Sequence, residues 1–177
     1  MNKMHTMAAA AALAALILMI APAASYAQKP TGATPIAPHT YHGRISSVQP
    51  DDKGAPAWIQ SGVWALKIKG TGSAVTSYKS YLGFRAVFDM VKPDGTAMHR
   101  HVVSDLKASS FTNENNVYAI NGTATVTMKG APVKDVPVSI KVMNDSAMAI
   151  WIGPSGVDGH FGTAPVYGTV AVPPARR

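Results

Sequence analysis

The chain has 177 residues, no cysteine, and a formal net charge of +7 from 16 Lys and Arg residues against 9 Asp and Glu residues. The absence of cysteine excludes disulfides, thiolate zinc sites, blue-copper centres and a cysteine nucleophile. The basic residues are dispersed and form no dense run interleaved with aromatic residues, so we expect no nucleic-acid binding. Because Glu114 is the only glutamate, a glycosidase that uses a pair of glutamates is excluded as well.

The first 27 residues have the pattern of a secretory signal peptide. A short polar head with Lys3 precedes an apolar run over residues 7–20, and small residues follow at Ser25 and Ala27. The apolar run is shorter than the roughly 20 residues that a membrane-spanning helix needs. We therefore expect a chain that is exported to the periplasm or the extracellular space, with cleavage before Gln28 and no transmembrane segment after it.

The remaining sequence predicts strands rather than helices. The chain contains 15 Gly and 13 Pro residues, which recur too often to leave room for long helices. Only residues 104–111 show any helical pattern, and that stretch is short. Apolar and polar residues alternate with a period of two, as in strands with one buried face, over residues 64–69, 84–90, 123–129 and 136–142.

Three further segments complete the predicted sheet. Residues 147–152 are apolar on both faces and are expected in its middle, whereas residues 41–48 and 166–172 are expected to supply outer strands. About eight short strands separated by turns predict an antiparallel β-sandwich or a small β-barrel. We expect one all-β domain over residues 40–172, preceded by a flexible segment at 28–39 and followed by a flexible tail at 173–177.

A Pro-Asp-Gly turn at residues 93–95 predicts a hairpin between two of these strands. If its loop has three residues, which the local turn chemistry favours, Asp89 lies opposite His99 and both His99 and His101 share the polar face. If the loop has four residues, Phe88 lies opposite His99 and the two histidines point into the apolar interior. Because a shift of one residue exchanges the two faces, the sequence leaves both registers open.

The same hairpin carries the residues that are most suited to bind a metal. His99 and His101 are two positions apart in a predicted strand, so their side chains leave the same face roughly 6 to 7 Å apart and can converge on one ion. His160 is the best candidate for a third ligand, with a carboxylate from Asp89 or Asp105 as a possible addition. The alternative interpretation is that these histidines are surface or core residues with no ligand role.

Part of the sequence resembles a known metal-binding pattern. The pattern comprises Gly95, His99, His101 and Asp105, followed by residues 154–156 and His160. It is similar in part to the two metal motifs of cupins, which are jelly-roll barrels that bind a metal through three His and a Glu. The resemblance implies a metal-dependent enzyme of cupin-like type, with Asp105 in the position of the Glu. The glycine lies closer to the first His than in cupins, and His160 comes one residue later.

The metal and the function stay open at this point. Imidazole ligands suit several divalent transition metals, of which we expect copper or zinc. Met90 and Met98 flank the His-bearing strand and would be soft ligands for Cu(I), with core packing as their alternative role. The chain is then an exported protein that binds a metal or small ligand, a metal-dependent enzyme, or a non-catalytic surface or matrix protein. Ring nitrogens within about 4–5 Å of one another would indicate a metal site.

Overall fold

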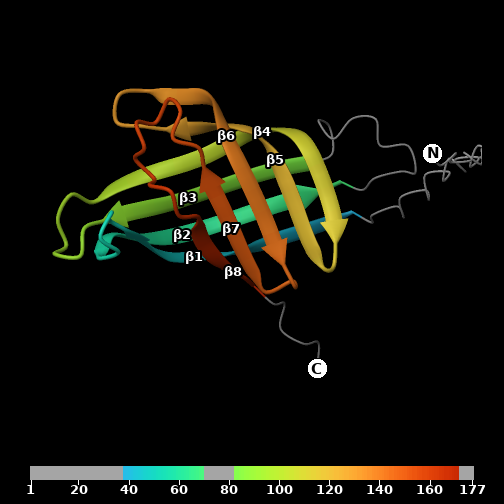
Figure 1. Cartoon of the computed structure of the whole chain (residues 1–177). Coiled ribbons are helices and arrows are strands. Elements are labelled where there is room, and N and C mark those ends of the chain that lie inside the picture. The colour runs from blue at the N-terminus through green and yellow to red at the C-terminus, as the bar shows by residue number, and fades with distance from the viewer. Residues whose placement is uncertain (1–37, 70–81, 172–177) are drawn as a thin grey trace, which may run out of the picture. The chain divides into compact units, whose positions relative to one another are not determined.

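The computed structural model describes residues 38–69 and 82–171. The expected signal peptide, most of the expected segment 28–39 and the expected tail 173–177 lie outside the described residues. The described residues form eight strands that close into a barrel (Figure 1). These strands are β1 (His39–Pro50), β2 (Pro56–Ile68), β3 (Leu82–Val91), β4 (His99–Glu114), β5 (Val117–Thr127), β6 (Pro132–Met143), β7 (Ala147–Ile152) and β8 (Val166–Val170).

The barrel is a meander in which every strand pairs antiparallel with its neighbour in sequence and β8 returns to β1. The expectation of a β-sandwich or small β-barrel is thereby confirmed as a barrel. The jelly-roll connectivity implied by the cupin resemblance is wrong, because no connection crosses from one strand pair to another. The placement of residues 41–48 and 166–172 in outer strands is also wrong, since these two segments pair with each other.

Glycine and tryptophan make this closure possible. Gly43 pairs with Val170 and Ile45 with Gly168, and a Cβ atom on Gly43 would collide with the carbonyl group of Thr169. The indole N–H of Trp64 donates to that same carbonyl oxygen at 3.1 Å. The pairing of residues 43–45 with residues 168–170 closes the sheet, so the first and last strands of this cysteine-free chain hold each other by backbone pairing.

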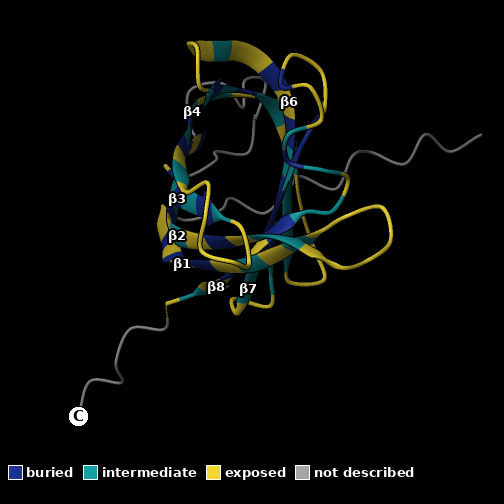
Figure 2. Ribbon diagram, turned by 90° about the vertical axis from the view of Figure 1, so that its left-hand side faces the viewer, coloured by how far each residue is buried: buried dark blue, intermediate teal, exposed yellow. Residues whose placement is uncertain are grey.

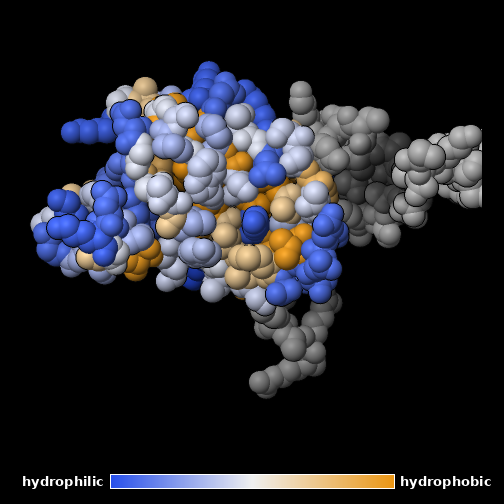
Figure 3. All heavy atoms as spheres, viewed as in Figure 1, coloured by the Kyte–Doolittle hydropathy of each residue, from blue (hydrophilic) through white to orange (hydrophobic). Residues whose placement is uncertain are grey.

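The interior is filled by the side chains that the alternating pattern assigns to one face. The regular strands turn every second residue inward, as in β3, where Phe84, Ala86, Phe88 and Met90 are all buried. Figure 2, viewed along the barrel, shows the strands as a closed ring with buried residues recurring along them. On the outer face seen in Figure 3, apolar residues form small groups between polar ones. Among the described residues, no helix is long and apolar enough to cross a membrane.

Strands β4 and β5 are longer than the sequence pattern indicates. They pair as far as Glu114 and Val117 and are joined by Asn115 and Asn116, which have positive φ of 51° and 60°. Residues 104–111, where a helical pattern was visible, lie inside β4. The β4–β5 pairing shifts register twice within this stretch, and such bulges interrupt the period of two by which strands are identified.

Four loops lie at one end of the barrel, which we call the mouth. They join β1 to β2, β3 to β4, β5 to β6 and β7 to β8, and the last of them, residues 153–165, is the longest. The short β4–β5 and β6–β7 hairpins lie at the opposite end. Any site built from the β3–β4 hairpin and residue 160 must therefore be at the mouth.

The first prediction concerns the seam between β1 and β8. Gly43→Ala should lower the free energy of unfolding by about 1–3 kcal/mol or more, since overpacking forces the paired backbones apart. Gly83→Ala is the matched control, because a Cβ atom at Gly83 in β3 meets nothing within 4 Å. That control should leave stability unchanged or slightly raised. Denaturant unfolding measures both, and equal stabilities would contradict the role of Gly43.

Candidate metal centre

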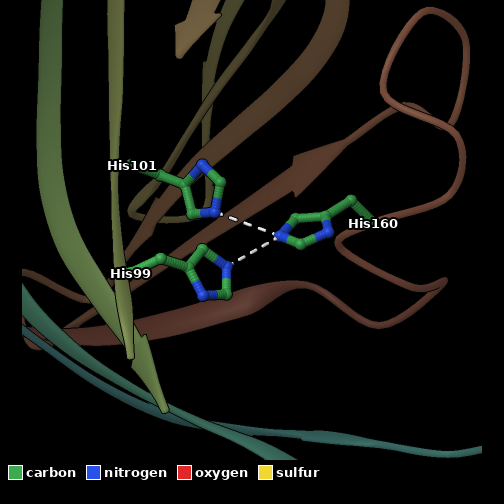
Figure 4. A group of neighbouring side chains, drawn as sticks. All are labelled: His99, His101 and His160. Atoms are coloured by element: carbon green, nitrogen blue, oxygen red, sulfur yellow. Dashed lines mark hydrogen bonds between the residues drawn. The ribbon is translucent and has the colours of Figure 1, made fainter. Parts of the chain in front are cut away.

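Three histidine side chains converge at the mouth of the barrel. His99 and His101 lie at the start of β4, and His160 approaches from the β7–β8 loop (Figure 4). The Nε2 atom of His160 lies 3.0 Å from Nε2 of His99 and 3.1 Å from Nε2 of His101. One ligand atom from each of the three residues falls within 4.8 Å of the others. These nitrogens are therefore as close together as the roughly 4–5 Å expected of a metal site.

An extra residue in the β3–β4 hairpin decides where the two strand histidines point. The three-residue loop expected from turn chemistry does form, because the N–H of Lys92 donates to the carbonyl of Thr96 at 3.0 Å and Gly95 has a φ of 83°. Ala97 then adopts a φ of 55°, and the register shifts by one residue. This bulge turns His99 and His101 from the outer face to the interior.

Neither register considered from the sequence predicts the residues that pair with His99 and His101. His99 pairs with Met90 and His101 with Phe88, which is the interior face expected for the four-residue loop but with a different pairing. Asp89 pairs with Arg100 on the outer face, where the guanidinium binds the carboxylate through two hydrogen bonds of 2.8 and 3.0 Å.

Backbone carbonyls fix the orientation of both strand histidines. Nδ1 of His99 lies 2.7 Å from the carbonyl oxygen of Ala97, and Nδ1 of His101 lies 2.7 Å from that of Thr127. A carbonyl oxygen can only accept, so each Nδ1 carries a proton, and Nε2, which faces His160, is the nitrogen that can offer a lone pair to a ligand. Metal-binding histidines are oriented in this way by the partner of their other nitrogen.

His160 is held by the loop that covers the mouth. Val157 and Phe161 of this loop are buried in the barrel core, and they anchor residues 158–160 between them. The side-chain amide of Gln49 donates to the carbonyl oxygen of His160 at 3.3 Å. Gln60, which is 2% exposed, donates in turn to Gln49 at 3.4 Å. The two glutamines tie β1 and β2 to the loop and limit the movement of His160.

Aromatic rings enclose the histidine group. The ring of Trp58 meets that of His99 edge-on, with 5.1 Å between centroids. The rings of Phe88 and Phe161 lie 5.8 and 4.9 Å from the ring of His101, which is only 2% exposed. These apolar neighbours remove water from the innermost imidazole.

Burial keeps two of the imidazoles neutral at pH 7. It lowers the pKa of His101 to about 4, against the opposing effect of the Thr127 carbonyl and with a further contribution from the other two rings. Burial, followed by repulsion from His99, also lowers the pKa of His160. The Nε2 atoms of His99 and His101 both face Nε2 of His160, which can donate at most one N–H. A cation at their centre would satisfy all three nitrogens.

The other residues considered from the sequence lie elsewhere. Asp89 is bound to Arg100 outside the barrel, as described above. Asp105, with a φ of 54° at a register shift in β4, is exposed and contacts the hydroxyl of Ser104. Neither carboxylate belongs to the histidine group, so the cupin-like ligand role implied for Asp105 has no counterpart here. His39 and His42 lie in the half of β1 that is remote from the mouth.

A cavity of about 520 Å³ lies beside the three imidazoles. It is lined by the three histidines together with Ala97, Met98, Arg100, Met128 and Lys129. A second hollow of about 580 Å³ on the outer face of β1–β4 has no histidine in its lining. Of these two hollows, the cavity at the mouth is the one that borders the three histidines.

Comparisons with protein-family models, with curated proteins and with solved structures find no match to this chain. The resemblance to cupins therefore rests on two short motifs alone, and no family model supports it. The geometry of the histidine group is the basis for the functional proposal that follows.

The second prediction concerns the pH dependence of the metal-free protein. The folded state keeps His101 neutral down to about pH 4, whereas the unfolded chain takes up its proton near pH 6.5. The unfolded state binds more protons between these values, so stability is full above about pH 6.5 and falls as the pH is lowered. We expect a loss of about 1–2 kcal/mol between pH 7 and pH 5, measured by denaturant unfolding with a chelator present.

The His101→Gln variant should lose less stability than the wild type over the same interval. His42→Gln, at an exposed position of β1, is the control and should behave as the wild type does. Equal losses in all three proteins would show that His101 does not cause the pH dependence.

Proposed function

We propose that this chain is an exported metal-binding protein that holds one transition-metal ion, copper or zinc, at the mouth of its barrel. The ligands are the Nε2 atoms of His99, His101 and His160. The observation that carries the proposal is the convergence of these three atoms from two separate parts of the chain. The N-terminal signal pattern supports the export.

Two of the three nitrogen separations are close to those expected around a metal ion. Metal–nitrogen bonds of about 2.0–2.1 Å at tetrahedral angles place two ligand nitrogens about 3.3 Å apart. The two Nε2 separations that involve His160 are 3.0 and 3.1 Å. The three ligand atoms as a group lie within 4.8 Å of one another, so the imidazoles of His99 and His101 must approach each other around the ion, while His160, on a loop rather than a strand, moves outward by a few tenths of an ångström.

The surroundings also suit a bound ion. The carbonyls of Ala97 and Thr127 hold the proton on Nδ1, which leaves Nε2 free as a ligand and raises its basicity. The lowered pKa values of His101 and His160 keep both imidazoles neutral at pH 7, so protons compete little with a metal ion for their nitrogens. A matrix protein with incidental histidines would need none of these features.

The third prediction tests the ligand set. The wild-type chain should bind one Cu(II) or Zn(II) ion, and His101→Gln or His160→Gln should weaken binding by more than about 100-fold. That loss exceeds the 10–100-fold effect of removing a supporting group around a metal. Calorimetric titration and metal content after dialysis measure it. His42→Gln, remote from the mouth, should bind metal as the wild type does. Equal metal content in wild type and a His99→Ala/His101→Ala double variant would overturn the proposal.

A metal-dependent enzyme is the second candidate function, and the cavity beside the histidines favours it. Three protein ligands are the number found in catalytic zinc sites, where water or substrate takes the fourth position. The cavity of about 520 Å³ has room for a small substrate next to that position.

The fourth prediction separates the enzyme from the binding protein. If the site is catalytic, the zinc-loaded wild type should hydrolyse an activated ester such as 4-nitrophenyl acetate, in proportion to its zinc content. The His101→Gln variant, prepared with the same total zinc, supplies the background rate. A rate equal to that background would count against a hydrolytic role and leave the binding function in place.

A further inference from the structure

We infer that the ion bound at this site is copper in its +1 state, with the thioether sulfur of Met98 as the fourth ligand beside the three Nε2 atoms. This inference rests on the proposed metal-binding function and names the metal for the same site. Three observations support it: an exposed methionine at the cavity, a second thioether in the same lining, and the charges around the ion.

Met98 has no packing role that explains its position. It directly precedes His99, lines the cavity at the histidine group, and is 68% exposed. Methionine in a barrel protein usually fills gaps in the core, as Met90 and Met148 do here at 0% exposure. Met98 stands in the loop directly before β4 and lines the cavity from there.

Met128 places a second thioether at the same cavity. It follows Thr127, whose carbonyl orients His101, and it packs partly against the core. Met90, which the sequence suggested as a soft ligand, is instead buried and accepts a long hydrogen bond from Gln60 at 3.9 Å. Thioethers select Cu(I) over Zn(II), because a soft sulfur ligand suits a soft ion.

The charges around the site favour a monovalent ion. The three imidazoles are neutral ligands, and the charged residues in the cavity lining are Lys129 and Arg100, whose charge is balanced by Asp89. Among the described residues that line the cavity there is no carboxylate to balance a second positive charge. The desolvation cost of an ion grows with its charge, so neutral ligands beside the cation Lys129 accommodate Cu(I) at less cost than a divalent ion.

The fifth prediction tests the thioether ligand directly. Cu(I) affinity is measured without oxygen by competition with a chromophoric Cu(I) chelator, and Zn(II) affinity by competition with a zinc indicator. Met98→Leu should weaken Cu(I) binding by about tenfold or more, because the three imidazoles that remain still hold the ion, and should leave Zn(II) affinity unchanged. X-ray absorption of the Cu(I) form should show a copper–sulfur contribution that this variant loses.

Two further variants make the result specific. Met143→Leu is the matched control, because Met143 ends β6 at the end of the barrel opposite the mouth and should not affect either metal. Met128→Leu tests the other thioether, and a loss of Cu(I) affinity in that variant alone would overturn the assignment to Met98. Unchanged Cu(I) affinity in both cavity variants would overturn the inference altogether.

The outcome is separable from that of the proposed function. If His101→Gln abolishes binding of both metals while Met98→Leu changes neither, the three-histidine site stands and the Cu(I) inference fails. If His101→Gln changes neither metal, the proposed function itself fails.

Discussion

The pairing of β1 with β8 is the constraint on which the rest of this structure depends. The chain has no cysteine, so nothing covalent holds its ends, and an open sheet would expose two edges. Closure requires two backbones to approach across Gly43, and the indole of Trp64 reaches from the interior to the same carbonyl that faces this glycine. Closing the ring also determines which loops share an end, and that brings residue 160 to the start of β4.

Within this barrel, the site depends on one extra residue, Ala97, in the β3–β4 hairpin. The Pro-Asp-Gly loop closes as its chemistry requires, and without Ala97 in a left-handed conformation the next residues would continue in that register. The two strand histidines would then lie outside, beside Asp89. The bulge exchanges the faces, buries His101 and leaves Arg100 outside to bind Asp89. Local strain in one loop residue therefore decides whether a site exists.

The sequence predicts much of this arrangement, for identifiable reasons. Strands with one buried face, such as β3 and β6, alternate cleanly and are recognised, whereas the second half of β4 is hidden by its register shifts. The two histidines of β4 lie on one face in any register, so the sequence predicts that they lie side by side. It does not predict whether that face points inward or outward. The carbonyls of Ala97 and Thr127 leave no signal, because every residue has one. Gln60 does leave one: it is a polar residue at an inward position of β2.

The separation of the ligands along the chain has one more consequence. His101 and His160 are 59 positions apart, and one lies in a strand while the other lies in a loop. An ion that joins them closes a long loop of the chain, as a disulfide does, and restricts the unfolded ensemble in the same way. The ion would then be a removable cross-link in a protein that has no covalent one. Its loss would loosen the β7–β8 loop, residues 153–165, before the strands separate, so resistance of this loop to proteases would depend on the supply of metal.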